Sequence, residues 1–213
     1  MSDTAAPFAN LHETALRALA PHGVVRSFAK HAVLVNQGDE TDSLYVLLSG
    51  RVKAFVSDQD GREVVVNLIE AGDYFGEMVL DGGPRSASVM SLEPCRCFVI
   101  PRQDVEALLS TNPEFTRHLI DKLIGVGRRL TAKVLDLALK DVYSRLSQFL
   151  NENAVERDGM RVVAERLTQH DIAARIGGSR EMVSRILRDL STGGYISVDT
   201  KQICILKKLP AHW

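Results

Sequence analysis

Residues 168–190 of the chain read TQHDIAARIGGSREMVSRILRDL, which is two short helical patterns joined by a pair of glycines. Thr168 and Ser179 are residue types that favour the N-cap position, and each stands directly before one of the two patterns. Gly177 and Gly178 end the first pattern, because glycine tolerates the left-handed backbone that commonly closes a helix. Two helices joined by a tight glycine turn have the layout of a helix-turn-helix.

The second helical pattern separates apolar from polar side chains. Its apolar positions recur at helical spacing and predict one buried stripe. Arginine can bond guanine through two hydrogen bonds, glutamate can accept from cytosine N4, and serine can serve either base. The polar side chains therefore predict contacts with double-stranded DNA, in preference to a helix whose charges only keep it soluble. The stripe consists of Val183, Ile186, Leu187 and Leu190, and the other faces carry Arg180, Glu181, Ser184, Arg185 and Arg188.

Short apolar runs flank the two helices on both sides. MRVVAERLT precedes them at residues 160–168, and GGYISVDTKQICIL follows at 193–206, where DTK separates two apolar runs as a hairpin turn would. This arrangement predicts a winged variant of the motif. Between residues 160 and 213 there are nine Lys and Arg against five Asp and Glu, a balance of +4 in a chain whose net charge is −1. The positive charge lies where DNA phosphates would be met.

The whole chain has the size and composition of a two-domain protein. It has 213 residues, 45% of them hydrophobic and 25% charged, and domains usually contain about 100–150 residues. No stretch is apolar enough to span a bilayer, and the N-terminus lacks the pattern of a secretion signal, so we expect a cytoplasmic protein with no membrane partner. The three cysteines include no CxxC pair, which argues against a disulfide framework and against a metal site.

Residues 24–100 have an all-β pattern. Short runs rich in Val, Leu and Ile alternate with turn signals, and Gly50, Gly61 and Gly72 recur every eleven residues between them. The clearest hairpin turn is DQDG at residues 58–61. The spacing predicts a sandwich, barrel or jelly roll.

After Pro113 the pattern becomes helical for more than the dozen or so residues of an average helix. A near-heptad apolar stripe, with spacings of 4, 3, 4, 4 and 3, predicts that this helix pairs with its copy in a homodimer, although packing on the chain's own β domain is the alternative. A two-fold dimer also matches a helix-turn-helix that meets two half-sites. The expected dimer interface is Leu119, Leu123, Val126, Leu130, Val134 and Leu137.

Residues 72–89, GDYFGEMVLDGGPRSASV, combine the groups of an anion site in one turn-rich segment. Gly76 and Glu77 offer a backbone amide and a carboxylate that can accept from sugar hydroxyls. Arg85 and Ser86, with the amide of Ala87, form a donor cluster suited to phosphate. Pairing of Arg85 with a nearby carboxylate on the surface is the alternative.

Two of these segments resemble one known family. GDYFGEMVLDGGPRSASV resembles the phosphate-binding cassette of cyclic-nucleotide-binding domains, and GGSREMVSRILRDL resembles the recognition helix of the Crp-Fnr transcription regulators. The resemblance implies an α+β protein: a double-stranded β-helix (jelly roll) sensor domain at residues 1–112, a dimerisation helix at 113–140, and a winged helix-turn-helix domain at 141–213. The family's hinge matches Asp141 and Val142.

The resemblance also assigns roles to residues. It makes cyclic AMP the expected effector, with no covalent cofactor, and half of the family's adenine-contacting pair is present, as Thr131, with Leu130 at the other position. It implies sequence-specific DNA binding by a transcription regulator, and RNA polymerase as a further partner near residues 151–159, NENAVERDG. The implied nucleotide-binding residues are Gly76, Glu77, Met78, Arg85, Ser86, Ala87 and Thr131, and the implied DNA-binding residues are Thr168, Gln169, Ser179, Arg180, Glu181, Ser184 and Arg185.

Several alternatives stay open at this point. Arg180, Glu181 and Arg185 match the set that reads TGTGA half-sites in the family, whereas Glu181, Ser184 and Arg185 match the set that reads TTGAT. The effector could be cyclic di-GMP or another anion, or DNA binding could need no ligand. An enzyme of the cupin class is disfavoured, because the β segments hold no histidine after His31, and we find no catalytic residues.

Overall fold

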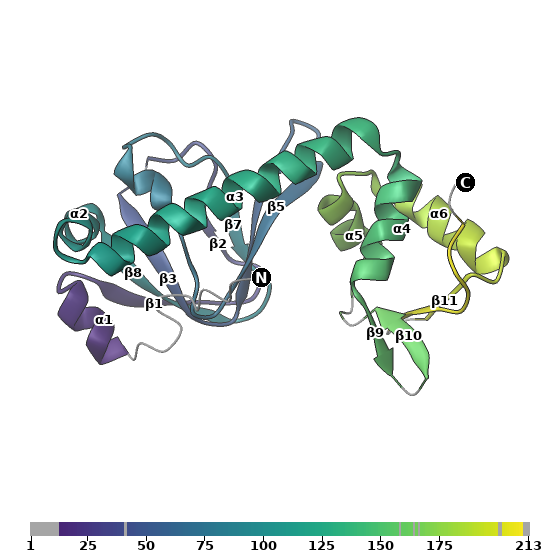
Figure 1. The fold of residues 1–213 in the computed structure, drawn as a ribbon, viewed down its shortest axis with the longest axis horizontal. Coiled ribbons are helices and arrows are strands. Elements are labelled where there is room, and N and C mark those ends of the chain that lie inside the picture. Colours follow the sequence, from purple (N-terminus) through teal and green to yellow (C-terminus); the bar gives the residue numbers. More distant parts are fainter. Residues whose placement is uncertain are drawn as a thin grey trace. The chain divides into compact units, whose positions relative to one another are not determined.

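The computed structural model describes residues 13–40, 42–157, 159–163, 165, 167–199 and 202–210 (Figure 1). The described residues fall into two compact units. The first is drawn from residues 1–56 and 66–129, and the second from residues 57–65 and 130–213. Among the described residues, no helix has the length and apolarity needed to cross a membrane.

The first unit contains two antiparallel four-stranded sheets, with strand orders β1-β8-β3-β6 and β2-β7-β4-β5. The all-β prediction for residues 24–100 is confirmed, and the architecture is the expected jelly roll. Gly50, Gly61 and Gly72 all have positive φ, of 85°, 74° and 91°, so they do mark turns. The strands are β1 (Val24–Phe28), β2 (Val33–Val35), β3 (Ser43–Ser49), β4 (Arg51–Ser57), β5 (Glu63–Glu70), β6 (Tyr74–Phe75), β7 (Ser88–Ser91) and β8 (Cys95–Pro101).

Strand β3 is buried on both faces, because each face of its sheet is covered. Leu44 and Val46 belong to a core with the helices, whereas Leu47 belongs to the core between the two sheets. The period of two along a strand explains this alternation. Cys95 and Cys97 are both buried on the inter-sheet face, because residues two apart in a strand point to the same side. The helices of this unit are α1 (Glu13–Leu19), the 3-10 turn η1 (Glu77–Leu80), α2 (Arg102–Thr111) and the first part of α3 (Pro113–Leu139).

The second unit has a helix-turn-helix and a small antiparallel sheet of order β11-β12-β10-β9. The long helix α3 ends at Leu139, and Asp141 caps the next helix by accepting from the Ser144 amide at 2.7 Å, so a boundary between two helices lies where the resemblance implies a hinge. The segment 151–157 is not a loop, because α4 extends to Glu152 and a strand follows at Ala154–Arg157. The elements are α4 (Val142–Glu152), β9 (Ala154–Arg157), β10 (Met160–Val163), α5 (Gln169–Ile176), α6 (Arg180–Thr192), β11 (Ile196–Val198) and β12 (Ile203–Ile205).

Candidate nucleic-acid interface and ligand cassette

The two helices of the motif begin at side-chain caps. Thr168 Oγ1 accepts from the Asp171 amide at 3.1 Å, and Asp171 Oδ2 accepts from the Thr168 amide at 2.9 Å, which is a reciprocal capping box. Ser179 Oγ accepts from the Met182 amide at 3.2 Å. Gly177 has φ 66° and ends α5 in the left-handed conformation. The sequence-predicted start of each helix is therefore confirmed.

Helix α6 buries one stripe and exposes the other. Val183 and Leu190 are fully buried, and Ile186 and Leu187 join them in the core of the second unit, as predicted. Bonds from its own amide and from the Ser179 hydroxyl hold the pKa of the exposed Glu181 carboxyl below its usual value. Glu181 is therefore ionised and able to accept from a cytosine amino group. Arg180, Glu181, Arg185 and Arg188 are exposed, and Ser184 is half-buried.

A hollow lies where the two helices of the motif begin. Its lining residues are Thr168, Gln169, His170 and Arg180. Because both helix N-termini present amide groups and a partial positive charge, this end of the motif suits phosphate contacts. The arrangement brings predicted DNA-binding residues from α5 and α6 to one site.

The small sheet supplies the wing. Strands β11 and β12 pair in antiparallel register from Ile196–Ile205 to Val198–Ile203, and Asp199 donates its amide to the Gln202 carbonyl at 3.1 Å. The predicted hairpin is confirmed, and two residues of its predicted turn, Thr200 and Lys201, lie outside the described residues. β10 pairs with β12, so the strand before the motif and the wing after it form one sheet.

The ligand cassette begins at the end of β6. Gly76 follows this strand with φ 93°, a left-handed conformation that favours glycine, and the 3-10 turn η1 starts at Glu77. A Cβ on residue 76 would lie 2.6 Å from Arg85 Nη1 and 3.0 Å from the Ser43 carbonyl oxygen. Glycine is therefore needed here for both conformation and space.

The Arg85 side chain is buried and turned toward backbone carbonyls. Nη2 donates to the Ser43 carbonyl at 2.8 Å and Nη1 to the Gly76 carbonyl at 3.2 Å, and the guanidinium carbon lies 5.7 Å from the centre of the Tyr45 ring. Burial lowers the pKa of this guanidinium, while nearby acidic groups raise it. No ion pair joins Arg85 to a carboxylate within the described ranges, so the alternative of a surface pair is not observed. A buried cation held by neutral carbonyls is suited to an incoming anion.

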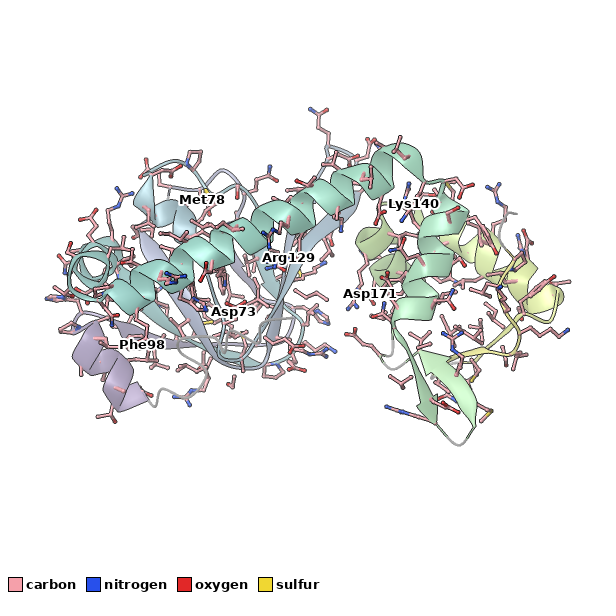
Figure 2. The ribbon with its side chains drawn as sticks, in the orientation of Figure 1. Asp73, Met78, Phe98, Arg129, Lys140 and Asp171 are labelled. Carbon is pink, nitrogen blue, oxygen red and sulfur yellow. The ribbon has the colours of Figure 1, made fainter. Side chains whose placement is uncertain are left out.

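The other cassette residues lie near the surface. Ser86 is exposed and Ala87 half-buried just before β7, while Glu77 and Met78 are half-buried in η1 (Met78 in Figure 2). Thr131 lies on the exposed surface of α3, in the second unit. The structure thus brings Gly76 and Arg85 into contact.

Helix α3 exposes an apolar stripe, with one correction to the sequence prediction. Leu119 is only 5% exposed and packs with Phe115 in the core of the first unit, so it is not available at a dimer interface. At this end of the helix the exposed stripe passes through Ile120 instead of Leu119, because the helical period of 3.6 residues drifts against the heptad period of 3.5. Val126 is half-buried. The exposed large apolar residues of α3 are Ile120, Leu123, Ile124, Leu130, Val134, Leu135, Leu137 and Leu139.

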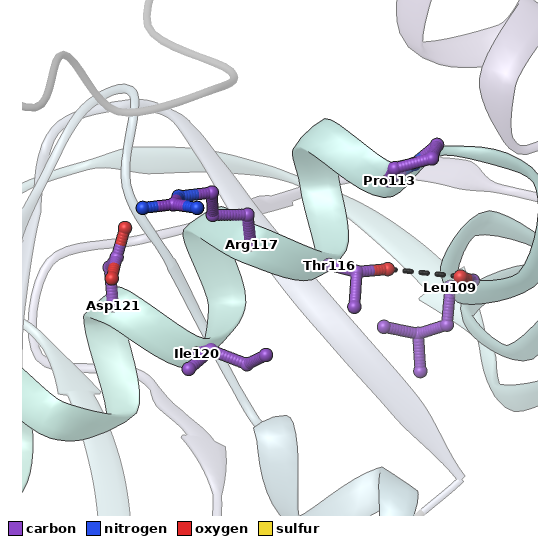
Figure 3. Close-up of a pocket in the computed structure, with 6 residues that line it drawn as sticks. All are labelled: Leu109, Pro113, Thr116, Arg117, Ile120 and Asp121. Carbon is purple, nitrogen blue, oxygen red and sulfur yellow. Dashed lines mark hydrogen bonds between the residues drawn. The ribbon is translucent and has the colours of Figure 1, made fainter.

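The exposed stripe begins beside a surface pocket (Figure 3). The pocket lies where α2 ends and α3 begins, and the Thr116 hydroxyl at its edge donates to the Leu109 carbonyl at 2.9 Å. Figure 3 shows Arg117 and Asp121 on one side of α3 and Ile120 on another. Ile120, which lines the pocket, is 53% exposed and belongs to the apolar face of α3. The pocket is therefore an open extension of that face and not an enclosed ligand site.

Sequence reasoning missed two cations that join separate segments of the chain: Lys122, whose side chain is only 9% exposed, and the half-buried Arg145. Lys122, on the inner face of α3, contacts Asp73 and the Tyr74 carbonyl. Arg145 of α4 donates to the carbonyls of Ile176 at 2.7 Å and Gly177 at 3.0 Å, and so fastens the turn between the two helices of the motif. A lysine on the same helix face as buried apolar residues is a signal that could have revealed the first, whereas no local pattern reveals the second.

Two family models match the chain in the order of its two units. The family described as "Cyclic nucleotide-binding domain" matches residues 25–112, and the family described as "Crp-like helix-turn-helix domain" matches residues 144–209. The first match contains the cassette, and the second contains the capped helices and the wing.

Curated relatives match over almost their whole length. The cAMP-activated global transcriptional regulator CRP of Pasteurella multocida is 31% identical over 192 residues, which are 86% of this chain and 90% of the relative. The CRP-like cAMP-activated global transcriptional regulator of Mycobacterium tuberculosis is 29% identical over 203 residues, 93% of this chain and 91% of the relative.

Solved structures share the fold. The c-di-GMP responsive global regulator CLP of Xanthomonas campestris has a TM-score of 0.77 at 25% identity, over 91% of this chain and 98% of that one. A CooA mutant from Carboxydothermus hydrogenoformans has a TM-score of 0.78 at 20% identity, over 97% of this chain and 94% of that one, which is a likeness of fold alone.

Proposed function

This chain belongs to the Crp-Fnr family of transcription regulators, and on that premise we propose that it is a homodimer that binds palindromic double-stranded DNA under the control of cyclic AMP. The observation that carries this proposal is helix α6, whose capped N-terminal turn presents Arg180 and Glu181, with Arg185 one turn further on. A recognition helix reads base edges in the major groove mainly through its N-terminal residues.

The DNA contacts divide into two kinds. Arg180, Glu181 and Arg185 read base edges, and we favour TGTGA half-sites because an exposed arginine at position 180 has a direct use at a G·C pair. Ser184 tolerates variation at one position of the half-site. Thr168, Gln169 and Ser179 contact the phosphate backbone, where the helix N-termini favour an anion.

The effector binds at the cassette. Gly76 and Glu77 hold the ribose, Arg85, Ser86 and the Ala87 amide hold the cyclic phosphate, and Met78 lines the site. The buried Arg85, which has no carboxylate partner among the described residues, supports an anionic ligand. The names of the Pasteurella and Mycobacterium relatives support cyclic AMP. Thr131 contacts the base.

The second candidate is the same kind of regulator with cyclic di-GMP as its effector and TTGAT as its half-site. Two observations favour it: the likeness to the c-di-GMP responsive CLP, and the presence of Ser184 with Glu181 and Arg185. Leu130 in place of a hydroxyl residue at the expected base contact also weakens the adenine site.

The dimer forms through α3. Ile120, Leu123, Leu130, Val134 and Leu137 are exposed and, with Gly127 between the second and third, repeat at spacings of 3, 4, 3, 4 and 3, which is a heptad seam. Two copies placed by such a seam present two α6 helices to half-sites about one helical turn apart. We also propose that the protein contacts RNA polymerase, acts in the cytoplasm and catalyses no reaction. The names of the relatives, which are transcription regulators, support these three proposals.

The test is fluorescence anisotropy of the purified protein with a duplex carrying TGTGA and TCACA half-sites centred about one helical turn apart, at fixed salt. We expect tight binding only with cyclic AMP. Tight binding only with cyclic di-GMP, or on a TTGAT duplex, replaces the effector or the half-site by the second candidate. Equal binding to a scrambled duplex under all conditions would refute sequence-specific recognition.

A further inference from the structure

A buried lysine joins α3 to the strand that leads into the cassette. Lys122 Nζ donates to Asp73 Oδ1 and to the Tyr74 carbonyl, and lies 3.9 Å from the centre of the Tyr74 ring. The Lys122 side chain is only 9% exposed. Lysine is rarely buried unless it is paired, so the position of Lys122 depends on these three contacts.

A second contact lies one helical turn earlier. The Tyr74 hydroxyl is 3.2 Å from His118 Nδ1, and the Tyr74 ring is fully buried, 6.1 Å from the Phe115 ring between centres. Burial lowers the pKa of Lys122, and the Asp73 carboxylate opposes that shift. One face of α3 therefore contacts both the side chain and the backbone of Tyr74.

The contacted strand is short and leads directly into the ligand-binding residues. β6 consists of Tyr74 and Phe75, and its described ladder partner is β3, which it meets at Val46–Tyr74 and Tyr45–Phe75. Gly76 follows at once, so a shift of Tyr74 moves the backbone that carries Gly76 and Glu77. Backbone bonds between Leu47 and the residues just before β6, at 2.7 and 2.8 Å, extend this ladder by only a short stretch, so the sheet alone gives limited resistance to such a shift.

The same turn of α3 faces the proposed dimer seam. Leu123, the next residue after Lys122, is 40% exposed on the outer side of the helix. A helix is rigid across one turn, so a displacement of Leu123 on pairing with a second copy also displaces Lys122. One turn of α3 thus contacts the strand that leads into the cassette and also contributes to the proposed dimer seam.

We propose that Lys122 is a positioning residue for the ligand cassette, which holds β6 through Asp73 and the Tyr74 carbonyl and so couples the placement of α3 to that of Gly76 and Glu77. The coupling to a ligand rests on the proposed function, whereas the positioning of the segment does not. Lys122 touches no ligand in this scheme and acts through the strand.

Hydrogen exchange of the full-length protein without added ligand tests the positioning. Lys122→Met keeps the length of the side chain but removes the charge and the donors, and Lys122→Arg keeps a cation. We expect Lys122→Met to raise amide hydrogen exchange at residues 74–80 by about tenfold relative to the wild type. Exchange in the other strands of the two sheets should be unchanged. Lys122→Arg restores part of the protection. Lys30→Met, at an exposed lysine of the same unit, is the matched control and leaves exchange unchanged.

Calorimetric titration with cyclic AMP on the same variants separates this inference from the proposed function. Weaker binding by Lys122→Met, together with local exchange, supports the coupling. Unchanged exchange at 74–80, or a rise spread evenly over the jelly roll, overturns the positioning role. Failure of the wild type to bind cyclic AMP and cyclic di-GMP refutes the effector assignment and leaves the exchange result to decide the role of Lys122.

Discussion

The Arg85 guanidinium donates to the carbonyl of Gly76, nine positions earlier in the chain, at 3.2 Å. This bond closes the loop between β6 and β7, because it joins the first cassette residue after β6 to the arginine shortly before β7. Arg85 also donates to the Ser43 carbonyl at 2.8 Å, so the side chain assigned to phosphate holds the site together before any ligand arrives. Structure and ligand binding are therefore coupled at this arginine.

We predict that Gly76→Ala lowers both stability and ligand affinity. Alanine in the left-handed region costs about 1–2 kcal/mol. The added Cβ would also lie 2.6 Å from Arg85 Nη1 and 3.0 Å from the Ser43 carbonyl oxygen, which forces the Arg85 side chain to move. Urea unfolding and calorimetric titration with cyclic AMP measure the two effects. Gly61→Ala is the control: φ is also positive, at 74°, but no heavy atom of the described residues beyond its chain neighbours lies within 4 Å of the new Cβ. Equal losses in the two variants would show that contact with Arg85 has no importance.

For Arg85 itself we predict different effects from two substitutions. Arg85→Ala removes a donor from the buried Ser43 carbonyl, at a cost of about 1–3 kcal/mol, and abolishes the phosphate contact, whereas the Gly76 carbonyl keeps its bond from the Val79 amide. Arg85→Lys keeps the charge but cannot reach two carbonyls and a ligand at once, so it loses affinity with a smaller loss of stability. The free energy of unfolding and the dissociation constant, measured on the same samples, distinguish them. Ligand affinity that survives in Arg85→Ala would remove Arg85 from the phosphate site.

The helix-turn-helix could be predicted from sequence because its signals are local. Thr168 and Ser179 cap the helices where their side-chain chemistry indicates, and Gly177 takes the left-handed conformation that its position predicts. The turns at Gly50, Gly61 and Gly72 were predictable for the same reason. Each of these features depends on a few neighbouring residues, which one sequence contains in full.

The contacts made across the fold could not be predicted. The apolar spacing of Leu119 suits a dimer seam and a domain core equally well, and only the packing against Phe115 decides between them. Arg85 and Ser43 are 42 residues apart, and Lys122 and Asp73 are 49 apart, so neither contact leaves a local pattern. The cassette residues were predicted, but the neighbours that position them were not.

We predict that Asp171 contributes stability that is lost in acid. Burial by itself raises the pKa of Asp171, but bonds from the Thr168 hydroxyl and amide and the charge of Arg175 outweigh it, so the pKa is lowered overall. The unfolded chain, whose Asp titrates near pH 4, then takes up the proton first. The contribution is therefore full above about pH 4 and declines as the pH falls through the lower folded pKa. Below about pH 4 the free energy of unfolding of the wild type should fall more steeply with pH than that of Asp171→Asn. If Asp171→Asn loses stability below about pH 4 as steeply as the wild type does, Asp171 makes no such contribution.

The seam on α3 gives a prediction about assembly. Val134 is 65% exposed, so Val134→Glu should alter the stability of the separate chain by no more than about 0.5 kcal/mol. In a two-fold seam the same change places two carboxylates against each other and against apolar side chains, which opposes pairing. Sedimentation velocity should show monomers at concentrations where the wild type is dimeric. Val24→Glu, 47% exposed on β1, should remain dimeric, and dimers that persist in Val134→Glu would move the interface elsewhere.

The last prediction separates base reading from charge attraction on α6. Arg185 and Arg188 are both exposed and lie three residues apart on one helix, so removal of either changes the charge by the same amount. Arg185→Ala should weaken binding to the matched duplex by about 1–3 kcal/mol and leave binding to a scrambled duplex nearly unchanged, because a bidentate contact to guanine discriminates between bases. Arg188→Ala should weaken binding to both duplexes alike, with a salt dependence reduced by about one phosphate contact. Anisotropy titrations of both variants on both duplexes, each at several salt concentrations, provide the comparison. If the two variants lose the same affinity on both duplexes, Arg185 touches only the backbone, and specificity must come from Arg180 and Glu181, the two residues that the Ser179 cap places at the start of the helix.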